Sequence, residues 1–227
     1  MDLNIDVAGI LTSLMIISSA SLIIPSVLRT ADSPSGSEEP SGYILALSRF
    51  TSIILLAFYV MYLYFQTWSH SHLFDECNEE EEGETNKLGS LASSMILILA
   101  AVGVAVCSDY LVDSVDGFVE AIGIGRAFIG LIIVPIIGNA GEFVATVQWA
   151  RTGRINLAIA VIVGSTLQIS LFVTPFLVMV GWAIGKSMSL QFDTFETIIL
   201  AMSVLVVDCL VRDGQTNYFE GLLLIGT

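Results

Sequence analysis

The 227-residue sequence is 55% hydrophobic and only 13% charged, and its mean hydropathy is +0.83. Its apolar residues come in long blocks, with no alternating or amphipathic pattern. Because an apolar block of about 20 residues crosses a bilayer as a helix, this composition excludes a soluble globular domain and predicts an all-α integral membrane protein, a polytopic helical bundle. The net charge of −14 argues against nucleic-acid binding and leaves the lipid bilayer as the expected surrounding.

Six apolar blocks have a length that spans a membrane, or nearly does. They cover residues 7–28, 43–66, 91–111, 126–150, 155–185 and 195–211. A seventh apolar segment begins near Tyr218, and the sequence stops inside it. We therefore expect the chain to be a fragment of a longer membrane protein, cut within its last helix.

The fourth predicted span contains a carboxylate, Glu142, in the run Gly-Asn-Ala-Gly-Glu at 138–142. A charged side chain at the bilayer centre costs about 2.5–3.5 kcal/mol or more, so such residues usually line an ion or substrate pathway. Pro135 removes a backbone donor and predicts a kink, which frees carbonyl oxygens, while Gly138 permits close approach of an ion. The alternative is a protonated Glu142 that hydrogen-bonds a neighbouring helix.

At helical spacing, Asn139, Glu142 and Thr146 fall on one face, which brings together an amide oxygen, a carboxylate and a hydroxyl. A set of oxygen ligands suits a hard cation such as Ca²⁺. The basic turn at 151–154 then predicts a helical hairpin, and the returning helix carries Ser165 and Gln168 in its middle. Pro175 predicts a second kink. Gln168 alone is also compatible with a packing role, but with Ser165 it favours a site opposite Glu142.

Acidic residues outside this motif form two groups. The first is a stripe of acidic residues along one helical face, beginning at Asp109. The stripe is compatible with the solvent-exposed side of a helix. For Asp109, the alternative is a pathway residue that guides cations towards Glu142. The stripe continues with Asp113, Asp116 and Glu120. The second group is a run that is either a solvated connector or a regulatory cation attractor. Its members are Asp75, Glu76, Glu79, Glu80, Glu81, Glu82 and Glu84.

Three stretches, at 138–142, 164–169 and 171–175, resemble the second ion-binding repeat of the vacuolar-type cation/proton exchangers, within the Ca²⁺/cation antiporter superfamily. The resemblance extends from Asp109 to the C-terminus. It implies half of an inverted-repeat fold: two helices from the end of the first half at 1–70, an acidic loop or helix at 71–90, and the second repeat, truncated at its C-terminus, at 91–227. The missing N-terminal half or a second copy of the chain is then an expected partner.

The resemblance also implies that Glu142 and Gln168 are the metal ligands, with Asn139, Gly138 and Ser165 beside them, and that Glu142 alternates between Ca²⁺ and protons. No cofactor is implied; the transported species are Ca²⁺ and H⁺, moved into a vacuole or another acidic organelle by alternating access. The chain departs from the vacuolar pattern at Phe143, where members of the family have His.

Two further readings stay open. Phe143 leaves room for Na⁺ or K⁺/H⁺ exchange by the same fold, and the single ion-binding motif leaves room for a non-transporting Ca²⁺-sensing accessory protein. An enzyme is disfavoured, because the sequence shows no Ser/His/Asp set, no HExxH and no phosphate-binding loop. The three dispersed cysteines predict neither a disulfide framework nor a zinc site.

Overall fold

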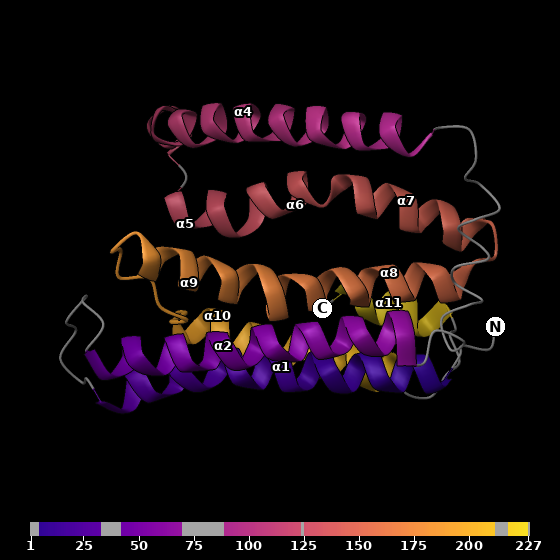
Figure 1. The fold of residues 1–227 in the computed structure, drawn as a ribbon, viewed down its shortest axis with the longest axis horizontal. Coiled ribbons are helices and arrows are strands. Elements are labelled where there is room, and N and C mark those ends of the chain that lie inside the picture. Colours follow the sequence, from indigo (N-terminus) through magenta and orange to yellow (C-terminus); the bar gives the residue numbers. More distant parts are fainter. Residues whose placement is uncertain (1–4, 33–41, 70–88, 124, 212–217, 227) are drawn as a thin grey trace. The chain divides into compact units, whose positions relative to one another are not determined.

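A computed structural model describes residues 5–32, 42–69, 89–123, 125–211 and 218–226 of the chain. These residues form helices joined by turns (Figure 1), and the predicted all-α membrane fold is confirmed. Among these described residues, five helices are long and apolar enough to cross a membrane, and the number rises to six if a bent pair of shorter helices is counted as one span. The predicted acidic run from Asp75 to Glu84 lies outside the described residues.

The chain divides into two compact units, one of residues 1–79 and 149–227 and the other of residues 80–148. The first unit is built on two N-terminal helices and on a long helix that contains a π-helical turn in its middle. Its elements are α1 (Ile5–Asp32), α2 (Gly42–Tyr64), η1 (Phe65–Ser69), α8 (Ile155–Leu167), η4 (Gln168–Val173), α9 (Thr174–Ala183), α10 (Thr194–Val211) and α11 (Tyr218–Gly226).

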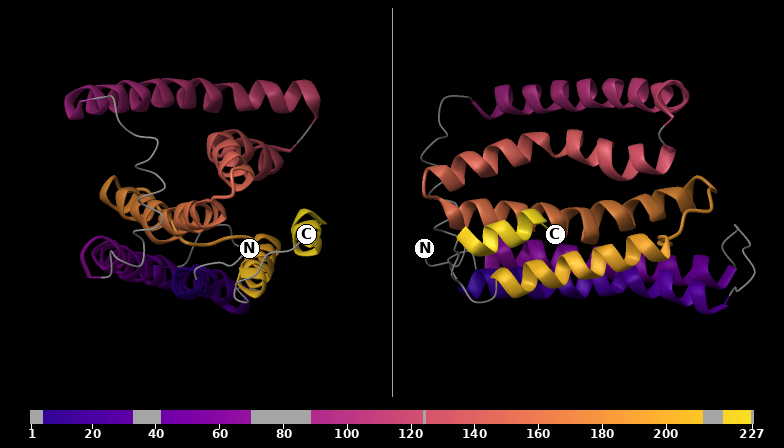
Figure 2. Two further views of the ribbon diagram at one scale, coloured as in Figure 1. Left: turned by 90° about the vertical axis from the view of Figure 1, so that its right-hand side faces the viewer. Right: turned by 180° about the vertical axis from the view of Figure 1, so that it is seen from behind.

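Helix α1 is the centre of the first unit, because it packs against α2, α8, η4 and α10 (Figures 1 and 2). Its buried face carries small hydroxyl residues, which allow other helices to approach closely. Ser18 and Ser19 are both buried, and each donates its hydroxyl proton to a carbonyl of its own helix, which satisfies it inside the apolar core. Leu55, Leu167 and Leu171, from α2, α8 and η4, are fully buried in the same core.

The long helix from Ile155 to Ala183 passes Pro175 without a break, as one apolar span, and the kink expected at Pro175 stays a prediction. Proline has no N–H, and its ring clashes with the carbonyl four residues earlier, that of Leu171. The chain widens into the π-turn η4 just before the proline, and Thr174 donates its N–H to the carbonyl of Ile169, five residues back. The wider turn accommodates the ring, so the helix continues as one span.

The connection between α9 and α10 is anchored to α1 and α2. Leu190 in this connection is fully buried, its N–H donates to the Ser48 hydroxyl (3.2 Å), and its carbonyl accepts from the Ser26 hydroxyl (3.3 Å). Phe192 donates its N–H to the same Ser26 oxygen at 3.0 Å. Two buried serines, each from a different helix, therefore fix a connection more than 140 residues away in sequence.

The second unit holds α4 (Ser90–Ile122), α5 (Arg126–Phe128), η3 (Ile129–Ile133), α6 (Val134–Gly138) and most of α7 (Ala140–Arg151). Helix α4 has 33 residues and extends beyond the predicted span at 91–111. The prediction stopped at residue 111 because the apolar run gives way to the acidic stripe there. At 1.5 Å per residue it is about 50 Å long, more than a bilayer core requires. It ends at Gly123, whose positive φ of 75° and N–H bond to the Val119 carbonyl cap the helix.

Candidate functional site

The helix that carries Glu142 is broken at Asn139. The segments Arg126–Gly138 and Ala140–Arg151 meet at an angle of 48°. The predicted kink is thus confirmed, but it lies four residues after Pro135. The π-turn η3 comes just before the proline, and in it Val134 donates its N–H to the Ile129 carbonyl, five residues back. This wider turn accommodates the proline ring without a bend at Pro135 itself. Asn139, with φ −94° and ψ 5°, leaves the helical conformation and makes the bend.

The break presents helix termini inside a membrane segment. Asn139 still donates its N–H to the Pro135 carbonyl (2.9 Å), and its own carbonyl accepts the N–H of Phe143 (2.9 Å). In general, the last carbonyls and the first N–H groups of a helix lie outside its backbone ladder and are available to other partners. Glu142 stands in the first turn of α7, at the positive end of that helix. The arrangement offers carbonyl oxygens and a carboxylate within one short stretch, as expected for a cation ligand set.

Side chains at the break differ in burial. Gly138, Asn139 and Glu142 are exposed in the structure, whereas Thr146, one turn beyond Glu142, is buried. The Thr146 hydroxyl lies 2.8 Å from the Glu142 carbonyl and 3.0 Å from that of Phe143. Thr146 thus donates its hydroxyl proton to the backbone of its own helix, which leaves the lone pairs of the hydroxyl oxygen available, and its place in an ion-facing set with Glu142 stays a prediction.

Ser165 and Gln168 lie in the other unit. Gln168 is the first residue of η4, its side chain is exposed, and its N–H points at the carbonyls of Gly164 and Ser165. Ser165 is half-buried in the last turn of α8. Each of the two predicted ligand groups thus lies at an interruption of regular helix. Gly138, Asn139 and Glu142 lie at a bend, and Gln168 lies at a π-turn. That the two groups bind one ion together stays a prediction.

Asp109 and the rest of the acidic stripe lie on α4, and all four side chains are exposed. One member has a partner that the sequence did not predict: Asp116 accepts an ion pair from Arg126 at 2.8 Å. The two residues face each other because the chain turns at Gly123, between α4 and α5. The closely spaced glycines in 123–125 could have indicated this turn from the sequence. Arg126 thus supplies a counter-charge to Asp116, and the pathway role of Asp109 stays a prediction.

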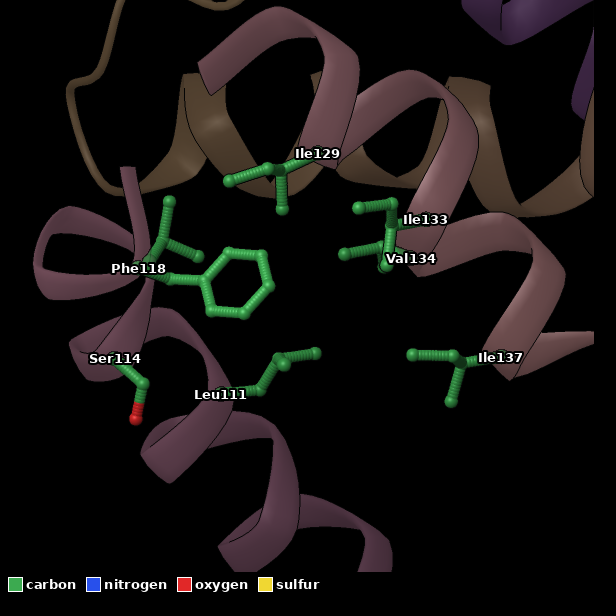
Figure 3. Close-up of a pocket in the computed structure, with 8 residues that line it drawn as sticks. Leu111, Ser114, Phe118, Ile129, Ile133, Val134 and Ile137 are labelled. Atoms are coloured by element: carbon green, nitrogen blue, oxygen red, sulfur yellow. The ribbon is translucent and has the colours of Figure 1, made fainter. Parts of the chain in front are cut away.

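A cavity of about 170 Å³ lies between α4 and the η3–α6 segment of the second unit (Figure 3). Its walls are apolar side chains, and the one hydroxyl among them, that of Ser114, donates to the Tyr110 carbonyl at 2.6 Å. The lining residues are Leu111, Ser114, Val115, Phe118, Ile129, Ile133, Val134 and Ile137. Such a surface does not solvate a cation, so this cavity is not the ion site.

Among the described residues, no group of three or more His, Cys, Asp and Glu side chains is placed to hold a metal ion. Amide, hydroxyl and backbone oxygens are present at the Asn139 break and at η4, and these are ligands that a hard cation accepts.

Comparison with known proteins identifies the family. Residues 92–227 match the family model described as sodium/calcium exchanger protein. The chain belongs to the sodium/calcium exchanger family. It is 39% identical to the vacuolar calcium ion transporter of Schizosaccharomyces pombe over 98% of its own length, and 35% identical to vacuolar cation/proton exchanger 3 of Oryza sativa subsp. japonica over 94%. The resemblance to vacuolar-type cation/proton exchangers is thereby confirmed.

A solved structure supports the same assignment. This member of the sodium/calcium exchanger family superposes on native YfkE, a protein named as a Ca²⁺/H⁺ antiporter, with a TM-score of 0.79 and 31% identity over the whole chain. The chain covers 62% of YfkE, 54% of the S. pombe transporter and 52% of the rice exchanger. It therefore spans about half the length of the relatives that it matches.

Proposed function

We propose that this chain supplies the second-repeat half of the cation path in a Ca²⁺/H⁺ antiporter of a vacuolar or other acidic organelle membrane. The observation that carries the proposal is the helix break at Asn139, which places Glu142 in the first turn of α7 within an apolar, membrane-spanning sequence. The names and the fold of its relatives support the choice of ions and of membrane.

The chemistry is ligand exchange, with no covalent step. Ca²⁺ and H⁺ compete for the same carboxylate lone pairs of Glu142, so protonation releases Ca²⁺, and loss of the proton restores the ligand. Proton flow out of the acidic compartment then drives Ca²⁺ inward. Gln168 supplies a neutral amide oxygen that binds Ca²⁺ in either protonation state of Glu142. Ser165, Asn139 and Gly138 contribute further oxygens and space.

Alternating access follows from the interrupted helices. The bend at Asn139 and the π-turn at Gln168 are the places where helices change direction or widen, so small rotations there expose the ligands to one side or the other. In this proposal the other half of the ligand set comes from an N-terminal half or from a second copy of the chain, and the acidic run from Asp75 to Glu84 acts as a regulatory attractor of cations.

The test is ⁴⁵Ca²⁺ uptake by the whole protein in vesicles with an acidic interior. Glu142→Gln keeps the size of the side chain but removes the exchangeable charge, and we expect it to abolish proton-driven uptake. Glu120→Gln is the matched control, because it makes the same change at an exposed carboxylate near the end of α4, and we expect near-normal uptake. Retained uptake in the Glu142→Gln protein would refute the proposed function.

Exchange of Na⁺ or K⁺ for H⁺ by the same site is the second candidate. Phe143 favours it, because this side chain stands next to Glu142, is 68% exposed and offers no ligand to a divalent ion. Proton flux that depends on Na⁺ or K⁺, ignores Ca²⁺ and disappears in the Glu142→Gln protein would select this candidate over the first.

A further inference from the structure

The π-turn η4, which begins with Gln168, is held on its opposite side by the two N-terminal helices. Ser170 donates its hydroxyl to the Ser18 oxygen of α1 at 3.1 Å. Phe172 stacks on Tyr59 of α2, with ring centroids 5.0 Å apart and an interplanar angle of 25°. Leu171, between them, is fully buried. The exposed side of this turn therefore carries Gln168, and the other side is anchored in the core.

The hydrogen bond at Ser18 has a defined direction. Ser18 is 1% exposed and has a single hydroxyl proton, which it donates to the Met15 carbonyl at 3.0 Å. Its oxygen therefore acts as the acceptor for Ser170. The Ser170 hydroxyl also lies 3.3 Å from the Leu167 carbonyl of its own helix, so its one proton is shared between that carbonyl and the Ser18 oxygen. Together with the aromatic stack and the buried leucine, the hydroxyl pair holds η4 against α1 and α2, and it is the contact whose loss leaves the apolar packing in place.

The backbone of η4 is wider than that of a regular helix. Pro175 has no N–H to donate to the Leu171 carbonyl, and the Thr174 N–H bonds the Ile169 carbonyl five residues back, so the side-chain bond to α1 adds to what holds this wider turn. We propose that Ser18 is a positioning residue for Gln168: through Ser170 it sets the direction in which the Gln168 amide faces the transported cation. This inference rests on the proposed function, and it assigns a role in cation affinity to a helix outside the ion-binding motifs.

The test compares Ser18→Ala with Ser19→Ala in ⁴⁵Ca²⁺ uptake at varied Ca²⁺ concentration. Both serines are buried on α1 and both bond a carbonyl of their own helix at 3.0 Å, but the bond to Ser170 is made by Ser18. We expect Ser18→Ala to raise the KM for Ca²⁺ about 3- to 10-fold, as for loss of one interhelical hydrogen bond, with little change in maximal rate. Ser19→Ala is expected to stay within about twofold of the native KM.

Two further variants separate positioning from general packing. Ser170→Ala removes the same bond from the half-buried side, and we expect the same KM as Ser18→Ala, with no added effect in the double variant. In a Gln168→Asn background, Ser18→Ala is expected to change Ca²⁺ affinity no further, measured by ⁴⁵Ca²⁺ binding to the purified protein if transport is too slow. A packing role would instead lower affinity additively in that background.

The inference is overturned if Ser18→Ala and Ser19→Ala give the same KM, or if the Ser18 effect adds fully to that of Gln168→Asn. Its failure is distinguishable from failure of the proposed function. Ca²⁺ uptake that is lost in Glu142→Gln but unaffected by Ser18→Ala contradicts the positioning role alone. Uptake that survives Glu142→Gln contradicts the proposed function itself.

Discussion

Ser26 holds the α9–α10 connection to α1, and we predict that Ser26→Ala destabilises the protein measurably. The Ser26 oxygen accepts the N–H of Phe192 at 3.0 Å, and its hydroxyl donates to the carbonyl of the buried Leu190 at 3.3 Å. Alanine removes both bonds and leaves a backbone donor and a backbone acceptor in the interior. A buried group without its partner costs about 1–3 kcal/mol, and Phe192 is partly exposed, so we expect a total of about 2 kcal/mol.

The assay is thermal unfolding of the purified protein in detergent, followed by tryptophan fluorescence. For a chain of this length, 2 kcal/mol corresponds to a fall in Tm of about 4–8 °C. Ser13→Ala is the control, because Ser13 is exposed on the same helix and bonds the Gly9 carbonyl at 2.7 Å, and its Tm is expected to change by less than about 2 °C. Equal Tm values for the two variants would show that the connection is not held through Ser26.

Two other substitutions probe steric and electrostatic features. Gly181→Ala is expected to lower the free energy of unfolding by about 1–3 kcal/mol, because the new Cβ would lie 2.8 Å from the Cβ of Met188. The control is Gly103→Ala on α4, where nothing lies within 4 Å of the new Cβ, and in the same melting assay it should be neutral or stabilising. Asp116→Asn is expected to cost at most about 1 kcal/mol at low salt and nothing measurable at high salt, because both partners of its ion pair with Arg126 are about two-thirds exposed; a large, salt-independent loss of Tm would contradict that estimate.

The sequence was sufficient for the membrane fold and for the place of most helices, because apolar length and turn residues act locally. Hydropathy located the spans, and the turn predicted at 151–154 is present, with Gly153 at φ +85°. The positions of the prolines did not locate the bend. Pro135 and Pro175 each follow a π-turn, the chain bends at Asn139, four residues after Pro135, and the helix from Ile155 to Ala183 continues as one span.

The candidate ligands were predictable from residue type, whereas their supports were not. Glu142 is conspicuous because a carboxylate in an apolar span is costly. By contrast, the bond between Ser18 and Ser170 joins residues 152 positions apart, and nothing in the sequence pairs two serines. Asp208 shows the same limit: it lies near the end of the span predicted at 195–211, yet it is only 7% exposed in α10, which packs against α1.

The central claim, that one carboxylate serves both ions, is tested most directly by ⁴⁵Ca²⁺ binding to the whole purified protein as a function of pH. Because a proton on Glu142 removes the ligand charge, the account predicts that native Ca²⁺ affinity falls as the pH is lowered. In Glu142→Gln, binding should be weak and independent of pH over the same range. Tight binding by Glu142→Gln, with the native pH dependence intact, would contradict the claim and place the exchangeable carboxylate elsewhere in the protein.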